Sequence, residues 1–262
     1  MGLGWTKLHA VTALLSFTLL GLESRPVKVM ISGGFSAAYQ DLRPQFEQSS
    51  QAHLETISGP SMGETPQAIP VRLTHGELAD VVIMARAPLD TLAKNGLVTD
   101  GSQVDLARSW IGMAVRAGAA PPDISSVDAF RNTLLNAKSV AYSDSASGVY
   151  IATTLFRRLG IEKEMAAKSR KIPAEPVGLV VARGEAEIGF QQMSELKPIK
   201  GITIVGSIPQ PLQLITVFSA GIVANGPNQA GGKALIQYLA SSAACSTIER
   251  TALEPIACAK PH

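Results

Sequence analysis

The stretch VKVMISGGFSAAYQDL, residues 27–42, decides how this sequence folds. Its β-branched and apolar beginning predicts a buried strand over residues 27–32, and helical spacing of apolar residues predicts a helix over residues 36–48. Two glycines, Gly33 and Gly34, separate them. The first N–H groups of a helix have no acceptor within the helix, and its dipole makes that end positive. We therefore expect an anion to bind at this junction.

Three further stretches repeat the form of a strand, then glycine or serine, then a helix. They are ISGPSMGE at residues 57–64, YSDSASGVY at residues 142–150 and, more weakly, FQQMSE at residues 190–195. Ligands of open α/β sheets lie beyond the carboxyl ends of the strands. These loops are therefore expected to meet at one cleft, although each one alone also fits an ordinary helix cap.

Short apolar runs alternate with amphipathic stretches along the whole chain, which predicts an α/β fold with parallel strands and covering helices. One such set ends near residue 94, and a second begins at SWIGMAVR, residues 109–116. A long apolar run over residues 214–224 is expected to return the chain to the first set. We predict one lobe from residues 25–108 with 215–262, a second lobe from residues 109–214, and a ligand cleft between them.

Composition and the N-terminus restrict the class of protein. A net charge of +2 and an aromatic content of 5% argue against a nucleic-acid partner. Residues 10–22 are apolar and follow Lys7 and His9, but they are shorter than the roughly 20 residues of a membrane span. We expect a cleaved signal peptide over residues 1–24 and a periplasmic location without membrane contact after cleavage; an uncleaved anchor is the alternative.

The two cysteines, Cys245 and Cys258, are 13 residues apart near the C-terminus. In an oxidising compartment this spacing predicts a disulfide that ties down the tail. Two unpaired, buried cysteines are the alternative. No set of metal ligands and no phosphate-binding or dinucleotide-binding glycine motif occurs in the sequence, so no metal or cofactor is expected.

Arg86 is the cation most suited to a ligand, because it follows the predicted buried strand ADVVIM and arginine can grip a carboxylate with two hydrogen bonds. A surface arginine opening a loop is the alternative. The candidates for a catalytic base are Glu64, His75 and Tyr150, each of which also has a structural interpretation as a cap, a turn residue or a core aromatic.

The order of VKVMISGGFSAAYQDL, ISGPSMG, RLTHGELADVVIMA, YSDSASGVYIATTLFRRLGI and VARGEAEIGF resembles the molybdate-binding-protein-like branch of periplasmic solute-binding proteins. The resemblance covers nearly all of the mature chain. It implies a two-lobed periplasmic-binding-protein fold of type II, with an anion-filled cleft that closes by hinge motion.

The binding residues that the resemblance implies depart from those of the molybdate binders. Their AAASL motif places its ligand serine on Gly34, and their second and third serines fall on Ser61 and Ser147. The tyrosine that closes over molybdate falls on Gln192. These departures favour a larger ligand that carries carboxylates. The full set of predicted binding residues is Gly34, Phe35, Ser36, Ser61, Met62, Gly63, Arg86, Ser145, Ser147, Gly148, Gln191 and Gln192.

The sequence also resembles periplasmic isomerases that use this scaffold to interconvert trans- and cis-aconitate. This resemblance implies a cofactor-independent allylic proton shift on a tricarboxylate. We expect the mature chain to be a monomer. The alternative is a receptor that delivers a molybdate-like oxyanion or a carboxylate to the permease of an ABC transporter. Both functions use the same fold, so the fold cannot separate them.

Overall fold

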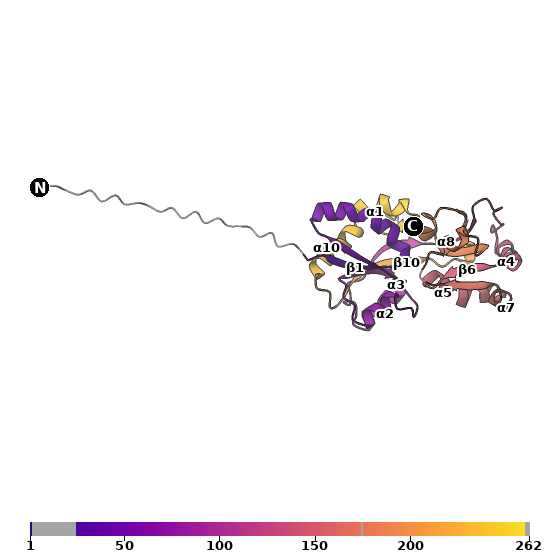
Figure 1. Cartoon of the computed structure of the whole chain (residues 1–262), viewed down its shortest axis with the longest axis horizontal. Coiled ribbons are helices and arrows are strands. Elements are labelled where there is room, and N and C mark those ends of the chain that lie inside the picture. Colours follow the sequence, from indigo (N-terminus) through magenta and orange to yellow (C-terminus); the bar gives the residue numbers. More distant parts are fainter. Residues whose placement is uncertain (2–24, 174, 260–262) are drawn as a thin grey trace.

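The computed structural model describes Met1, residues 25–173 and residues 175–259, so the predicted signal peptide lies, except for Met1, outside the described residues. Two β-sheets, each with its own helices, form two lobes that lie side by side (Figure 1). The predicted two-lobed α/β fold is thereby confirmed. Among the described residues, no helix has the length and apolar character needed to cross a membrane.

Lobe 1 is built on a six-stranded sheet with the strand order β11-β4-β10-β3-β1-β2. β1 pairs in parallel with β2 and β3, whereas β10 runs antiparallel to β3 and β4. The sheet is therefore mixed, and the expected parallel order holds for its first three strands. The bounds are β1 (Val27–Ile31), β2 (Leu54–Ser58), β3 (Val81–Ala85), β4 (Val104–Ser109), β10 (Thr216–Ile222) and β11 (Glu254–Pro255).

Helices cover both faces of this sheet because the side chains of its central strands alternate between them. Val29 and Ile31 of β1 pack into the core beneath α1, which contains Phe35, while Met30 packs into the core of the opposite face with Leu89. The helices of the first face are α1 (Gly33–Ser50), α10 (Gln229–Leu239) and α11 (Cys245–Arg250), and those of the second are α2 (Ile69–Thr74) and α3 (Arg86–Lys94).

Lobe 2 is built on a five-stranded sheet with the strand order β7-β6-β8-β5-β9. Its strands are β5 (Ile111–Arg116), β6 (Val140–Ser143), β7 (Ser169–Ile172), β8 (Ile188–Gln192) and β9 (Ile202–Ser207). Its helices are α4 (Val127–Asn136), α5 (Ala146–Tyr150), α6 (Phe156–Arg158), α7 (Glu162–Ala166), α8 (Val177–Ala182) and α9 (Met193–Leu196). A π-helical turn, Ile151–Leu155, joins α5 to α6.

The chain passes between the lobes twice and the lobes touch across the cleft. It leaves lobe 1 between β4 and β5 and returns between β9 and β10. The backbone N–H of Ser61 in lobe 1 donates to Ser145 Oγ in lobe 2 at 3.3 Å. Ser194 Oγ in lobe 2 donates to the carbonyl of Gly34 in lobe 1 at 2.7 Å. Residues of both lobes are thus brought within hydrogen-bonding distance at the strand ends.

The start of α1 differs from the prediction in a way that affects the site. The helix begins at Gly33, three residues before the predicted start at Ser36, and Ser32 is its extended N-cap with φ −91° and ψ 157°. Gly33 and Gly34 therefore belong to the first helical turn and do not form a separate loop.

Cys245 and Cys258 are joined by a disulfide, with a Cα–Cα distance of 6.3 Å. It closes a loop of 13 residues that links α11 to the end of the described chain. On the loop-entropy model, replacing both cysteines by serine is expected to lower the free energy of unfolding by about 3 kcal/mol. Urea unfolding of the double variant, compared with the oxidised parent, measures this loss. An unchanged midpoint would show that the bond does not constrain the unfolded chain.

Candidate functional site

A pocket of about 270 Å³ lies between the lobes at the carboxyl ends of strands from both sheets, and we call it the interlobe pocket. Lobe 1 contributes Gly33, Ser58, Gly59, Pro60 and Gln67. Lobe 2 contributes Ser143, Asp144, Ser145, Glu175, Pro176, Gln191 and Glu195. The loops after β1, β2 and β6 and the helix after β8 thus meet at one site, as expected for ligands of open α/β sheets.

The N-terminus of α1 gives the interlobe pocket its positive end. Gly33 lines the pocket and is the first residue of this 18-residue helix. Its N–H groups at Gly33 and Gly34 have no acceptor within the helix, and the dipole adds partial positive charge. The neighbouring Ser32 hydroxyl is 1% exposed and has no hydrogen-bond partner among the described residues. This end of the pocket therefore favours a negatively charged group.

Glu195 of α9 brings a carboxyl group to the same end. Its Oε1 accepts a hydrogen bond from Gln191 Nε2 at 3.0 Å. A Cβ atom added to Gly33 would lie 2.1 Å from that Oε1, so the carboxyl group rests directly on the glycine backbone. Burial raises the pKa of Glu195 from its ordinary value of 4.5 to about 7; hydrogen bonds from Gln191 and the backbone of Gln192 oppose the shift. The group therefore changes protonation near neutral pH.

Asp144 supplies a second carboxyl group from the loop after β6. It is 7% exposed, and its Oδ2 has no hydrogen-bond partner among the described residues. Burial raises its pKa, while the charge of Lys171 lowers it. The charge of Asp144 in turn contributes to raising the pKa of Glu195. An ionised Asp144 therefore disfavours ionisation of Glu195.

This arrangement suits proton transfer more than tight binding of an inorganic anion. No Lys, Arg or His side chain is among the residues that line the interlobe pocket. A base that titrates near the operating pH is well matched to general acid–base catalysis. The described residues contain no group of three or more His, Cys, Asp or Glu side chains that could hold a metal ion.

The residues that the resemblance implies as oxyanion ligands already contact other residues of the protein. A Cβ on Gly34 would lie 1.9 Å from Phe218 Cζ, so a ligand serine cannot be accommodated there without moving the ring. Ser61 Oγ accepts from the N–H of Ala85 at 3.0 Å. The Ser147 and Ser143 hydroxyls are 3.2 Å apart, and Gln192 Nε2 donates to Thr216 Oγ1 at 2.9 Å. Of the predicted binding set, Ser145 and Gln191 line the interlobe pocket.

Five predicted residues line a second and larger pocket of about 830 Å³, which also lies between the lobes, beside the chain crossing at Leu214–Val217. Tyr150 there donates its hydroxyl to the carbonyl of Leu212 at 2.5 Å. Arg86 donates from Nε to Asp90 at 2.7 Å and from Nη1 to Asp105 at 2.6 Å. The structure therefore places Arg86 outside the interlobe pocket, with its charge already compensated by two aspartates. The five residues are Ser61, Met62, Gly63, Arg86 and Tyr150.

Replacing Arg86 by alanine is consequently expected to leave the affinity for a tricarboxylate within about threefold of the parent. The half-exposed ion pairs to Asp90 and Asp105 each contribute up to about 1 kcal/mol, so a modest loss of stability is expected. Calorimetric titration with trans-aconitate and thermal unfolding measure the two effects. A loss of affinity above about tenfold at retained stability would return Arg86 to the binding site.

The remaining predicted residues have structural surroundings. Glu64 and His75 are exposed on lobe 1, and His75 Nδ1 is 2.7 Å from the carbonyl of Val71. Phe35 is fully buried in the core, and Ser36 Oγ accepts from Gln40 Nε2 at 3.4 Å. Gly148 is needed because a Cβ there would lie 1.6 Å from the carbonyl oxygen of Ser143. The structure brings none of these five into the interlobe pocket.

Apart from Ser145 and Gln191, the residues that line the interlobe pocket are absent from the predicted binding set, and those that matter most for its chemistry are Gly33, Asp144 and Glu195. Gly33 and Asp144 lie within two of the predicted strand-to-helix junctions, beside the serines and glycines that are predicted to bind the ligand. Glu195 ends the FQQMSE stretch, which is the weakest of the four predicted junctions. The sequence pattern that could have identified Glu195 is an acidic residue in the first turn of a helix that follows a buried strand.

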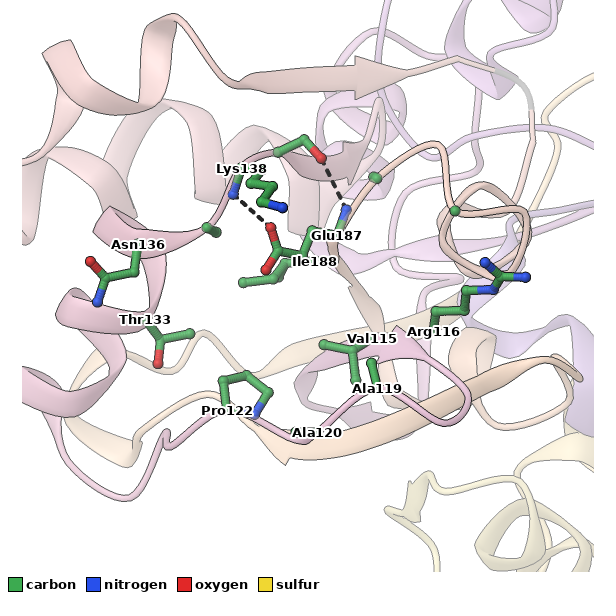
Figure 2. A pocket seen from close by; sticks show the side chains of 14 residues that line it. Val115, Arg116, Ala119, Ala120, Pro122, Thr133, Asn136, Lys138, Glu187 and Ile188 are labelled. Atoms are coloured by element: carbon green, nitrogen blue, oxygen red, sulfur yellow. Dashed lines mark hydrogen bonds between the residues drawn. The ribbon is translucent and has the colours of Figure 1, made fainter.

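A third pocket, of about 560 Å³, lies wholly within lobe 2 (Figure 2). Its polar contacts hold the segment before β6 against the segment before β8. The N–H of Lys138 donates to Glu187 Oε2 at 2.7 Å, and the N–H of Glu187 donates to Ser139 Oγ at 3.0 Å. Arg116 also lines it. Because no strand end of lobe 1 reaches this pocket, it is separate from the interlobe site.

Two α/β lobes joined by two crossings, with an anion-favouring pocket between them, define the architecture of a solute-binding protein. The chain belongs to the bacterial extracellular solute-binding protein family, whose model matches residues 27–252.

Similar individual proteins are consistent with membership of this family. An aconitate isomerase from Pseudomonas sp is 49% identical over 250 residues, which cover 94% of this chain and 95% of the relative. The molybdate-binding protein ModA of Azotobacter vinelandii is 24% identical over 238 residues, covering 87% and 89% of the two chains. The solved Azotobacter vinelandii periplasmic molybdate-binding protein superposes with a TM-score of 0.67 at 18% identity, covering 90% and 100%.

Proposed function

We propose that this protein interconverts trans- and cis-aconitate by an allylic proton shift in the interlobe pocket. The observation that carries the proposal is a carboxyl group, Glu195, with a pKa raised to about 7, placed at the positive end of α1. A receptor that only holds an anion gains nothing from a second negative group beside it, whereas an isomerase needs an acid–base group there. The identity of 49% to an aconitate isomerase supports the choice of substrate.

The reaction needs no redox step and no external reactant. A base removes a proton from the methylene carbon of trans-aconitate, and the electron pair spreads over the allyl unit and its carboxylate. The proton then returns to the other end of the allyl unit, and the base is restored. The N–H groups at the start of α1 stabilise the additional negative charge, which is the larger part of such catalysis. A pocket of about 270 Å³ suits a ligand smaller than a drug-sized molecule.

The proposal extends to the location, the oligomeric state and the lobe boundaries of the protein. We propose that residues 1–24 direct export to the periplasm and that the mature chain acts there as a monomer without a cofactor. The lobes are proposed to comprise residues 25–108 with 215–262 and residues 109–214. The ligand is proposed to enter when these lobes part at the two crossings.

A receptor that binds a carboxylate or oxyanion for the permease of an ABC transporter is the second candidate. The observation that favours it is the family, which is described as solute-binding. Turnover separates the two functions, because a receptor binds trans-aconitate and leaves it unchanged.

Proton NMR of the purified mature chain with trans-aconitate in D₂O tests the proposal. Growth of cis-aconitate signals without added metal or cofactor is the expected result, with heat-denatured protein as the control. Shifted or broadened trans-aconitate signals without product would support the receptor. An unaffected spectrum would contradict both, and titration with molybdate would then be the next step.

A further inference from the structure

We propose that Glu195 is the catalytic base that carries the migrating proton, and that Gly33 lacks a side chain so that this base can reach the substrate. The inference rests on the proposed isomerase function and assigns its central residue.

The position of Glu195 is the first support for this assignment. Its carboxyl oxygen Oε1 lies 2.1 Å from the position that a Cβ atom of Gly33 would take, which is too close for a side chain at residue 33. A substrate carboxylate bound to the N–H groups at the start of α1 therefore has its neighbouring carbon beside Glu195. That neighbouring carbon is the one from which a proton must leave, because its negative charge is delocalised onto the bound carboxylate.

The second support for the assignment is that Gly33 and Glu195 come from different lobes. Gly33 opens α1 in lobe 1, and Glu195 belongs to α9 in lobe 2. They meet because α9 contacts α1, with Ser194 Oγ donating to the carbonyl of Gly34 at 2.7 Å. Hinge opening would separate the base from the anion-binding helix end. The base is thus in place only around an enclosed substrate, where water is excluded and carbanion-like charge is best stabilised.

Asp144 is the other carboxyl group in the pocket and suits a different role. Its Oδ2 is buried without a partner among the described residues, so a protonated Asp144 has a hydroxyl free to donate to a substrate carboxylate. Glu195, by contrast, is oriented by Gln191 Nε2 at 3.0 Å. We assign Asp144 to binding and Glu195 to proton transfer. Glu175, the third acid of the pocket, is held by Arg183 Nη1 at 3.1 Å.

The proton balance needs only Glu195. The ionised carboxylate takes a proton from the methylene carbon, so one C–H bond breaks and one O–H bond forms. After the double bond shifts, the same O–H bond breaks and a C–H bond forms at the other end of the allyl unit. Substrate and product differ only in the position and geometry of the double bond, and Glu195 ends ionised as it began.

Replacing Glu195 by glutamine tests the assignment, with Glu164→Gln as the matched control. Glu164 is an exposed residue of α7 in lobe 2 and does not line the interlobe pocket. Turnover of trans-aconitate and exchange of its methylene protons with D₂O are followed by NMR, and affinity by calorimetric titration. The E195Q variant is expected to lose at least about 100-fold in both rates and to keep its affinity for trans-aconitate within about threefold. E164Q is expected to match the parent.

Two further variants, E195D and D144N, separate the role of Glu195 from that of Asp144. E195D is expected to regain measurable exchange, whereas D144N is expected to raise KM by about tenfold or more while kcat falls less. No turnover by the parent would overturn the proposed function itself. Turnover by the parent and by E195Q at similar rates would overturn only the assignment of Glu195. Loss of exchange in D144N with retention in E195Q would transfer the base role to Asp144.

Discussion

Replacement of Gly33 by alanine is expected to reduce turnover of trans-aconitate by at least about 100-fold, which is the usual contribution of a positioned base. The new methyl group would lie 2.1 Å from Glu195 Oε1 and 3.1 Å from its Cδ, so the carboxyl group must move away from the start of α1. The fold itself should not suffer. Gly33 is helical without a positive φ, and alanine is favoured over glycine in a helix by up to about 1 kcal/mol.

The adjacent glycine provides the control for this prediction. In Gly34→Ala the methyl group would lie 1.9 Å from Phe218 Cζ. Phe218 is packed in the core of lobe 1, so its ring cannot move away as an exposed side chain could. We expect this variant to lose about 1–3 kcal/mol of stability through overpacking. Steady-state kinetics and urea unfolding of both variants separate the effects. Parent-like turnover by G33A would mean that the observed position of Glu195 is not its working position.

The second large effect concerns stability and pH. Because burial raises the pKa of Glu195 from 4.5 to about 7, the folded state binds this proton more tightly than the unfolded chain does. The stability of the parent should therefore fall as pH rises from about 4.5 to about 7 and then level off. The difference of 7 − 4.5 = 2.5 corresponds to about 3 kcal/mol at 1.36 kcal/mol for each factor of ten. The raised pKa of Asp144 acts in the same direction.

E195Q removes this carboxyl group and should therefore be more stable than the parent at pH 8 by about 3 kcal/mol, with little difference at pH 4.5. Urea unfolding of both proteins across this pH range is the measurement, and E164Q again serves as the control. An E195Q variant whose stability follows that of the parent at every pH would show that Glu195 ionises as freely as an exposed acid. Gain of stability with loss of turnover is the expected pattern for a residue kept for function.

Much of the fold was predictable because its signals are local. The apolar runs of β1, β3 and β8 and the helices that follow them are recognisable from spacing alone. β4 has no such local signal, because its sequence, VDLARS, carries an aspartate and an arginine whose partners lie in other elements of lobe 1. Arg108 binds Glu254 at 2.7 Å, and Asp105 binds Arg86 at 2.6 Å. Tertiary pairing of this kind leaves no periodic pattern to recognise.

The candidate site was less predictable because residues from both lobes form it, and their proximity leaves no local pattern in the sequence. The sequence indicated an anion site at the start of α1, and the structure places Gly33 in the interlobe pocket. The predicted bases Glu64, His75 and Tyr150 stand close in sequence to the predicted binding loops or to a turn, but none of them lines the interlobe pocket. Glu195 is suited to the role only because it packs against Gly33, 162 residues earlier in the chain, and because burial raises its pKa.

The contact between Gly34 and Phe218 restricts the mutational routes between this protein and an oxyanion receptor. A serine at residue 34 would have to occupy space taken by the Phe218 ring, with three ring atoms within 2.6 Å of its Cβ. A serine at residue 34 alone therefore produces a clash and a smaller residue at 218 alone leaves a cavity, whereas the two substitutions together avoid both. The effects of substitutions at residues 34 and 218 are therefore expected to be strongly epistatic.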